Sequence, residues 1–462
     1  MSPTAVLVCS DAGVDAPLDG LPTVVVDDLC HSPAAAARAL STLGATRVVL
    51  GLCDRTSASS ALRSALRRAG AEPFGIEAVG LAGAEWPLAL LAAAAARLGR
   101  LSQGDPGRPV LAARPLSRQS LFSPSAVIDY EPVAVLDRSL CLGSDRCALC
   151  AEICPANAIA GGGRYPQVDA SACTACAECI RRCPAGALHL SGAAPSQVAA
   201  QLERLLELAD GVVLACARAE SPAVPAGWAL VTLPSLGVVT SGWILQIRAR
   251  GREVRLAGCG GPCCARAAAT EGLAHRIVGD RQWPVPTPTT SLQLREPAAT
   301  VEACGWIGAA PAAGDESPLG LLALRSERCT LCGACATSCP TAALQLDEGD
   351  DGTTLRYAHA ACTGCGRCVA VCPENALDLT RAVDPVLLER GSIELLGAPR
   401  EECVVCGATL PPAPLRRRLG EMLPGVAGSD LSMCAACARR AGAAAPDHPQ
   451  REERADNGED ES

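Results

Sequence analysis

Four short runs of cysteines constrain the fold of this chain more than any other feature of its sequence. Two of them, Cys329–Cys339 and Cys362–Cys372, have the spacing Cys-x2-Cys-x2-Cys-x3-Cys before a proline, with a hairpin-like spacer between them, and Cys173–Cys183 repeats the pattern in full. The run Cys147–Cys154 lacks its first cysteine, for which Cys141, with five residues between it and Cys147, is the simplest candidate. Thiols at such intervals lie on one loop and can surround a common metal centre.

These runs resemble those of bacterial ferredoxins with two [4Fe-4S] clusters, over Val133 to Leu190 and again over Leu322 to Leu379. In that family three cysteines of a run bind one cube, and the fourth binds the other. The resemblance implies four crossed sets of ligands: Cys141, Cys147, Cys150 and Cys183; Cys173, Cys176, Cys179 and Cys154; Cys329, Cys332, Cys335 and Cys372; Cys362, Cys365, Cys368 and Cys339. Zinc sites favour paired knuckles and disulfides need an oxidising compartment, so both alternatives are disfavoured.

The composition disfavours several other classes of protein. The 28 cysteines stand in a chain without an export signal, which indicates a reducing, cytoplasmic setting. The longest apolar segment, Pro87 to Ala96, is too short to span a membrane, and no basic stripe with aromatic residues favours nucleic acid. The net charge is −9, and the last eighteen residues carry seven acidic and two basic side chains, so a disordered acidic tail is expected.

The residues before the first cysteine run read as a small parallel α/β sheet. Apolar runs and helices alternate, with strands expected at Ala5–Cys9, Thr23–Cys30, Arg47–Cys53 and Gly75–Leu81 and helices at Pro33–Leu43 and Ala58–Ala69. Three strands end in a cysteine, at the sheet edge where α/β proteins bind ligands. Cys9, Cys30 and Cys53 are candidates for a further cluster, with a fourth ligand from His31, Asp11, Asp54 or a substrate thiol, or they are core thiols.

A second copy of this sheet is expected after a helix at Ser196–Ala209. Its strands are Gly211–Cys216, Trp228–Leu233, Val254–Cys259 and His275–Gly279, so Cys216 corresponds to Cys9 and Cys259 to Cys53. Val213–Cys216, Leu233–Gly237 and Ala257–Cys263 resemble the delta subunit of methyl-viologen-reducing hydrogenase, a [2Fe-2S] electron-transfer subunit found with heterodisulfide reductase. Two cysteines of that family are replaced here. The resemblance implies a [2Fe-2S] cluster on Cys216, Cys259, Cys263 and Cys264, and inert buried thiols are the alternative.

The first sheet resembles the amino-terminal part of the flavin-binding subunit of heterodisulfide reductase, in Arg47–Thr56 and Ala69–Pro73. The large flavin-binding domain of that family is missing here, because no Gly-x-Gly-x-x-Gly follows a strand. We therefore expect no flavin or nicotinamide site on this chain. Arg181, Arg182 and Arg367 adjoin the cysteine runs and would raise the reduction potentials of nearby clusters, unless they form a solvated face.

The C-terminal part carries two paired knuckles, Cys403-x2-Cys406 and Cys434-x2-Cys437, with 27 residues between them. Four thiolates at this spacing are typical of structural zinc in a ribbon too small to fold without metal, and a rubredoxin-like iron is the alternative. Cys304 stands alone and is expected to be structural.

The predicted fold class is therefore α/β plus α+β, with two small parallel sheets, two ferredoxin-like dicluster modules and a zinc-ribbon-like knuckle pair. The expected parts are an α/β domain with strand-end cysteines (1–119), a ferredoxin module (120–195), the hydrogenase-delta-like domain (196–282), a linker (283–318), a second ferredoxin module (319–385), the four-cysteine segment (386–440) and the acidic tail (441–462).

Together these features predict a multi-cluster electron-transfer subunit of a soluble hydrogenase- or heterodisulfide-reductase-like complex. Its partners would be redox proteins, namely hydrogenase, flavoprotein or reductase subunits. One alternative is an enzyme that reduces a disulfide or sulfur substrate at an open cluster in an α/β domain. A second alternative is a redox sensor or cluster scaffold.

Overall fold

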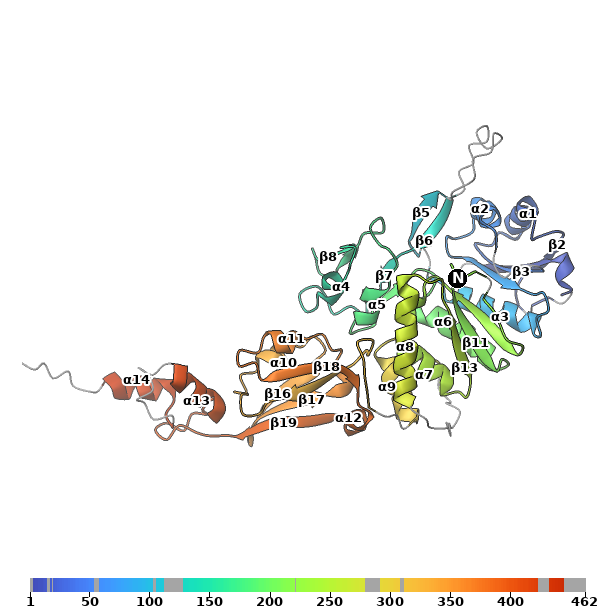
Figure 1. Ribbon diagram of the computed structural model, residues 1–462. Helices are drawn as coiled ribbons and strands as arrows, with labels where there is room; N and C mark the ends of the chain where they lie inside the picture. The colour runs from blue at the N-terminus through green and yellow to red at the C-terminus, as the bar shows by residue number, and fades with distance from the viewer. Residues whose placement is uncertain are drawn as a thin grey trace, which may run out of the picture.

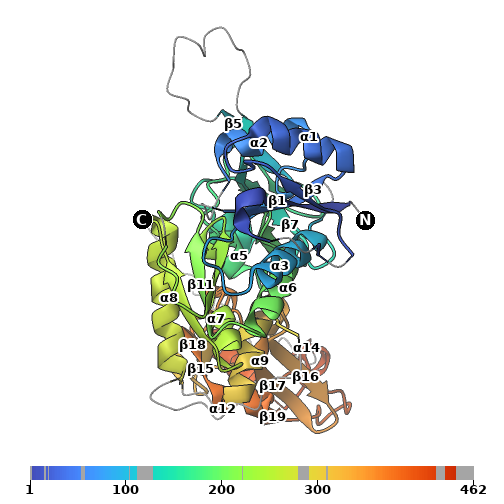
Figure 2. The ribbon, with the colours of Figure 1, turned by 90° about the vertical axis from the view of Figure 1, so that its right-hand side faces the viewer.

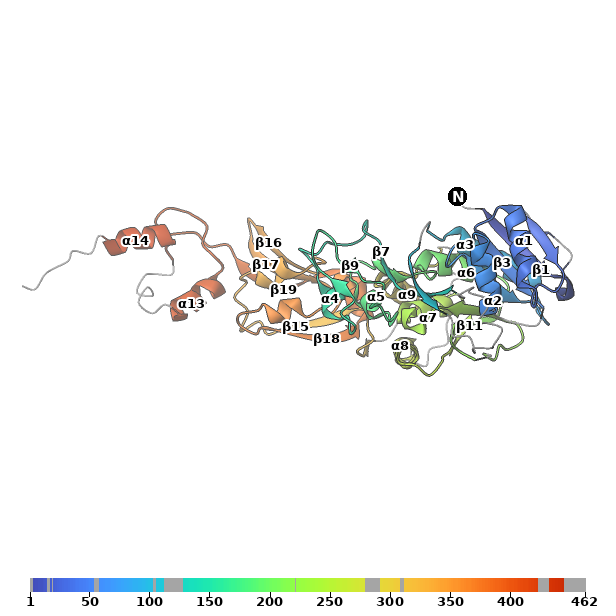
Figure 3. The same ribbon diagram turned by 90° about the horizontal axis from the view of Figure 1, so that it is seen from above.

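The computed structural model describes residues 3–14, 17–18, 20–53, 58–102, 105–111, 128–220, 222–278, 291–307, 311–422 and 432–443. Figure 1 and Figure 3 show these residues arranged along an elongated molecule. Two small parallel sheets lie at one end, two cysteine-rich modules lie in the middle, and α13 (Ala413–Met422) and α14 (Ala435–Ala443) lie at the other end. Within the described part, no helix combines the length and apolar character needed to cross a bilayer.

The N-terminal sheet is parallel throughout and has the strand order β2-β1-β3-β4. Its strands are β1 (Thr4–Cys9), β2 (Thr23–Val26), β3 (Arg47–Leu52) and β4 (Ile76–Gly80). Helices α1 (Pro33–Leu43) and α2 (Ser60–Arg68) cover one face, and α3 (Pro87–Gly99) covers the other (Figure 2). Because both faces are covered, β1 and β3 are buried along nearly their whole length, as their unbroken apolar sequences require.

The second strand is shorter than the sequence predicts. It ends at Val26 instead of Cys30, because Asp28 has a φ of 50°, which an extended strand does not allow. Cys30 therefore reaches the sheet edge from a turn, whereas Cys9 is the last residue of β1 and Cys53 directly follows β3.

The second sheet repeats the order of the first three strands of the N-terminal sheet, as β12-β11-β13, and is also parallel. Its elements are α6 (Pro195–Leu206), β11 (Gly211–Cys216), β12 (Trp228–Leu233), α7 (Ser241–Arg248), β13 (Glu253–Ala257) and α8 (Pro262–Val278). The predicted strand at His275–Gly279 is wrong, because its residues as far as Val278 belong to α8. Leu273, Ala274 and Ile277 are fully buried there at helical spacing.

Part of the stretch expected to be a linker, 283–318, is helical. Helix α9 (Ala298–Ile307) packs against α7 and buries Ala303 and Cys304 in the core of the second sheet. The indole of Trp243 on α7 donates to the carbonyl oxygen of Leu294, 2.6 Å away. Residues 283–290 of the predicted linker lie outside the described residues.

The first cysteine-rich module follows the antiparallel strands β5 (Gly107–Leu111) and β6 (Ile128–Pro132). It consists of the antiparallel pair β7 (Ala134–Leu136) and β10 (Leu188–Leu190), the pair β8 (Ile159–Ala160) and β9 (Gln167–Val168), and the short helices α4 (Leu149–Glu152) and α5 (Glu178–Arg182). Its small core contains the thiols of Cys150, Cys173 and Cys179. Cysteine side chains thus supply much of what would otherwise be apolar packing.

The second module has the same plan with longer strands. Its elements are β14 (Ala312–Ala313), β15 (Gly320–Leu324), α10 (Ala334–Ser338), β16 (Leu344–Gly349), β17 (Gly352–Ala358), α11 (Arg367–Ala370), β18 (Leu377–Val383), α12 (Pro385–Arg390) and β19 (Ser392–Pro399). The predicted hairpin-like spacer is present as β16 and β17. Strand β19 pairs with β17, so the module continues past the expected boundary at 385.

A buried arginine joins the two sheets where α3 packs against α6. The side chain of Arg97 on α3 is only 6% exposed. Its guanidinium donates to Glu77 Oε1 (3.2 Å), Gln201 Oε1 (3.1 Å) and the carbonyl oxygens of Gly192 (2.7 Å) and Thr232 (2.9 Å). These acceptors belong to both sheets and to the segment before α6, so one side chain ties the parts together.

The substitution Arg97→Met would keep the apolar stem but leave the carboxylate of Glu77 without its cation. We expect the free energy of unfolding to fall by about 3–5 kcal/mol, the usual cost of removing one partner of a buried ion pair. Chemical denaturation followed by circular dichroism measures this change. Arg100→Met, at the exposed end of the same helix, is the control and should change stability by less than about 0.5 kcal/mol. Equal losses in both variants would contradict this role of Arg97.

Candidate metal centres

The second module brings together Cys329, Cys332, Cys335 and Cys372. The first two lie on the loop that leads into α10, Cys335 lies on α10, and Cys372 follows α11. All four thiols line one cavity. Burial, together with the charges of the other three thiols, raises the pKa of Cys335 to about 11. The last cysteine of one run therefore lies with the first three of the other.

The reciprocal group is Cys339 with Cys362, Cys365 and Cys368. These four thiols line a separate cavity. Burial raises the pKa of Cys368 to about 12, and the charges of the other three thiols act in the same direction. Neither run of this module therefore encloses a group of four thiols by itself.

The first module repeats this exchange around a cavity lined by Cys154, Cys173, Cys176 and Cys179. Burial raises the pKa of Cys179, and the charges of the other three thiols and of Cys150 add to the effect. The influence of Cys150 also shows that the two groups of this module are neighbours.

The remaining group is Cys141, Cys147, Cys150 and Cys183. Burial raises the pKa of Cys150 to about 11, and the charges of Cys183, Cys147 and Cys141 contribute in the same direction. Cys141 thus lies with the other three despite its longer spacing. The extra residues form a turn at Gly143, whose φ is 92° and whose carbonyl oxygen accepts from the N–H of Cys147.

Residues with positive φ set the curvature of the other three runs. Each has one such residue directly before its second cysteine and one directly after it: Ala175 and Ala177, Leu331 and Gly333, and Gly364 and Gly366. At the end of a run, a backbone N–H four residues further on donates to the fourth thiol, from Ala158 to Cys154, Ala187 to Cys183 and Ala376 to Cys372. The loops therefore wrap around the thiols and aim amide dipoles at them.

These groups fit [4Fe-4S] clusters on chemical grounds. Four crowded, partly buried thiols disfavour one another's ionisation, as the raised pKa values of Cys335, Cys368 and Cys150 indicate. A cationic iron core at the centre of each group removes this conflict, because coordinated thiols are deprotonated. The crossed sets are therefore the residues that would hold four cubes.

Arginine side chains lie beside these groups, as the sequence predicted in part. Arg381 on β18 donates to the carbonyl oxygens of Thr363 and Gly364, at 3.2 and 3.3 Å. Burial lowers its pKa to about 10, and the charges of Arg182 and Arg181 act in the same direction, so guanidinium groups of both modules lie near one another. Sequence reasoning missed Arg381, since it lies outside the cysteine runs and nothing in its local pattern marks it.

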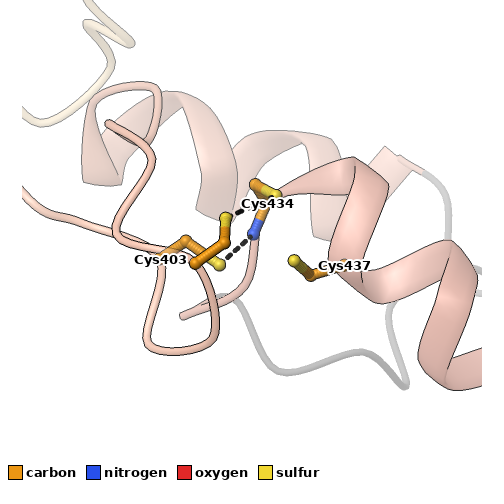
Figure 4. Close-up of side chains that lie close together, drawn as sticks. Cys403, Cys434 and Cys437 are labelled. Carbon is orange, nitrogen blue, oxygen red and sulfur yellow. Dashed lines mark hydrogen bonds between the residues drawn. The ribbon is translucent and has the colours of Figure 1, made fainter.

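The C-terminal knuckles converge as predicted. The thiols of Cys403, Cys406, Cys434 and Cys437 all lie within 4.8 Å of one another, and those of Cys406 and Cys434 are 3.7 Å apart. Figure 4 shows Cys403, Cys434 and Cys437 pointing toward one another, with the N–H of Cys434 donating to the thiol of Cys403 at 3.2 Å. This hydrogen bond lowers the pKa of Cys403 to about 6. The four thiols could hold one metal ion.

Each parallel sheet also gathers three of its predicted thiols. Cys9, Cys30 and Cys53 all lie within 4.8 Å of one another, as do Cys216, Cys259 and Cys264. The backbone N–H of Gly261 donates to Cys259 and lowers its pKa to about 7. The side chain of Cys263 and the whole of Asp54 lie outside what the structure describes. We refer to these groups as the N-terminal triad and the second triad.

Comparison with protein families identifies two segments of the chain. Residues 328–376 match a family described as a 4Fe-4S dicluster domain, and residues 166–189 match a family described as a 4Fe-4S binding domain. No curated protein matches the chain. The matched segments contain both cysteine runs of the second module and the second run of the first module, Cys173–Cys183. The chain therefore contains ferredoxin-type domains that bind 4Fe-4S clusters.

Proposed function

We propose that this chain is a multi-cluster electron-transfer subunit of a hydrogenase- or heterodisulfide-reductase-like oxidoreductase complex. One observation carries the proposal: the two modules meet through their cysteine runs. The charge of Cys365 in the second module acts on the pKa of Cys147 in the first. Bound cubes supply one-electron transfer. The chain's part is to hold the four cluster sites one after another, in an arrangement that we call the row.

The contact between the modules is made by residues of the runs themselves. Arg367, directly before Cys368, donates to the carbonyl oxygen of Arg146 and to Glu152 Oε1, both at 3.3 Å. Arg146 in turn donates to the carbonyl oxygen of Pro340, which follows Cys339. The Cys141 group and the Cys362 group are thereby the two central sites of the row.

The outer sites of the row adjoin other parts of the chain. A Cβ added to Gly237 would come within 2.8 Å of the carbonyl oxygen of Cys176, so the second sheet lies directly against the Cys173 group. At the other end, Arg418 on α13 donates to Glu374 at 3.0 Å, two residues after Cys372. Electrons could therefore enter or leave near the second sheet and near the C-terminal quartet, where we propose that redox partners bind.

Reversing the charge of Arg367 tests the row of sites. The variant Arg367→Glu places a carboxylate opposite Glu152 and should separate the modules. In the intact chain we expect about sixteen irons and magnetic interaction between reduced clusters of the two modules, seen by electron paramagnetic resonance. Arg367→Glu should keep the iron and sulfide and lose the inter-module interaction. Arg356→Glu, at an exposed ion pair of the second module, should keep both. Full iron without any interaction in the unaltered chain would refute the proposal.

A buried tyrosine distinguishes the Cys362 site from the others. The hydroxyl of Tyr357 donates to the carbonyl oxygen of Gly320 at 2.5 Å and lies beside the thiol of Cys362. Burial raises the pKa of this thiol, and the neighbouring hydroxyl acts in the opposite direction. It also contacts the Nδ1 atom of His359 at 3.0 Å. The Nε2 atom of His359 accepts from the N–H of Asp384 at 2.9 Å, so the single proton of a neutral ring lies on Nδ1. Burial lowers the pKa of His359, which keeps this network uncharged.

Polar groups beside cluster sulfurs stabilise the reduced state, which carries the extra negative charge. Tyr357→Phe should therefore lower the reduction potential of one cluster by on the order of tens of millivolts. A redox titration monitored by electron paramagnetic resonance measures the shift. Tyr165→Phe is the control: its ring packs against the guanidinium of Arg164 in the first module, and the variant should leave all potentials unchanged. An unchanged potential in Tyr357→Phe would show that the hydroxyl does not tune the cluster.

A further inference from the structure

The distances between sulfur atoms separate two kinds of thiol group in this molecule. Among the described residues, groups of three or more thiols that all lie within 4.8 Å of one another comprise only the C-terminal quartet, the N-terminal triad and the second triad. The four ferredoxin-type groups are therefore wider. This difference is expected, because the thiolates of a cube bind different iron atoms, whereas those of a mononuclear site share one ion.

The two triads have the spacing of a mononuclear site. A tetrahedral zinc ion with Zn–S bonds of about 2.3 Å holds its sulfurs about 3.8 Å apart. The thiols of Cys30 and Cys53 are 3.3 Å apart, those of Cys216 and Cys259 are 3.5 Å apart, and those of Cys259 and Cys264 are 3.6 Å apart. The C-terminal quartet, with its separation of 3.7 Å between Cys406 and Cys434, has the same dimension.

The two sheets assemble their triads from different elements. Cys9 and Cys216 both end the first strand, and Cys53 and Cys259 both follow the third strand. The third thiol comes from the turn after β2 in one sheet, as Cys30, and from the first turn of α8 in the other, as Cys264. Incidental burial of small apolar side chains gives no reason for two unrelated elements to complete the same cluster of sulfurs.

We propose that each triad binds a single thiophilic metal ion, with zinc as the expected ion, instead of an iron–sulfur cluster. Soft thiolate ligands in tetrahedral arrangement select such an ion. The [2Fe-2S] cluster that the sequence resemblance implies for the second sheet would need thiols on two irons, and the described thiols occupy the space around one. Counted over the described residues, three protein ligands leave a fourth position, which water or an added thiol can fill. These sites are independent of the proposed electron-transfer row.

Metal analysis of the full chain and four variants tests this proposal. Protein purified without oxygen is assayed for zinc, iron and acid-labile sulfide, and native mass spectrometry gives the mass of each bound group. Cys53→Ser and Cys259→Ser should each lose one metal ion per chain and no sulfide. Cys406→Ser, in the C-terminal quartet, should behave in the same way. Cys304→Ser removes a buried thiol outside every group and should lose nothing.

Two results would overturn the proposal. Loss of iron together with sulfide from Cys53→Ser or Cys259→Ser would show a cluster at that triad, and an unchanged metal content would show that the thiols bind no ion. Cys30→Ala and Cys264→Ala each remove a different ligand of the same two triads. If one variant of a triad misfolds, the other variant still tests that site. Retention of the ferredoxin-type iron in every variant separates this outcome from a failure of the electron-transfer proposal.

Discussion

The exchange of one thiol between paired cysteine runs is the constraint on which the rest of the structure depends. Because Cys339 lies with the Cys362 run and Cys372 with the Cys329 run, neither half of the second module has a complete set of ligands alone. The first module obeys the same rule through Cys154 and Cys183. Each group of four thiols therefore forms only when the two halves pack together, and metal bound there would stabilise modules with very small apolar cores.

The same constraint arranges the sites relative to one another. Thiols must lie on tight loops at the module surface, so two modules that dock through these loops place their sites close together. The hydrogen bonds of Arg367 and Arg146 hold the two modules together, and their acceptors are main-chain and carboxylate oxygens of the runs. Guanidinium groups such as that of Arg381 then stand beside the anionic thiolates and favour added negative charge there. The spacing of the cluster sites and the charges beside them thus both follow from the way the cysteine loops close.

The sequence predicted what local pattern determines and missed what tertiary packing determines. The helix at Pro33–Leu43 and the convergence of the C-terminal knuckles agree with the structure, because periodicity and cysteine spacing specify them. Residues His275–Val278 of the strand expected at His275–Gly279 belong to α8, since an apolar stretch of that length fits a helix or a strand equally well. The proximity of Tyr357 to Cys362 joins different elements, so only the fold reveals it. The scarcity of tyrosine, three in the whole chain, was the one available hint.

Anomalous diffraction at the iron absorption edge, from crystals grown without oxygen, tests the central claim most directly. The account predicts four iron peaks, each surrounded by three thiols of one run and the fourth thiol of its partner run. An iron centre bound by Cys329, Cys332, Cys335 and Cys339 of a single run would contradict it.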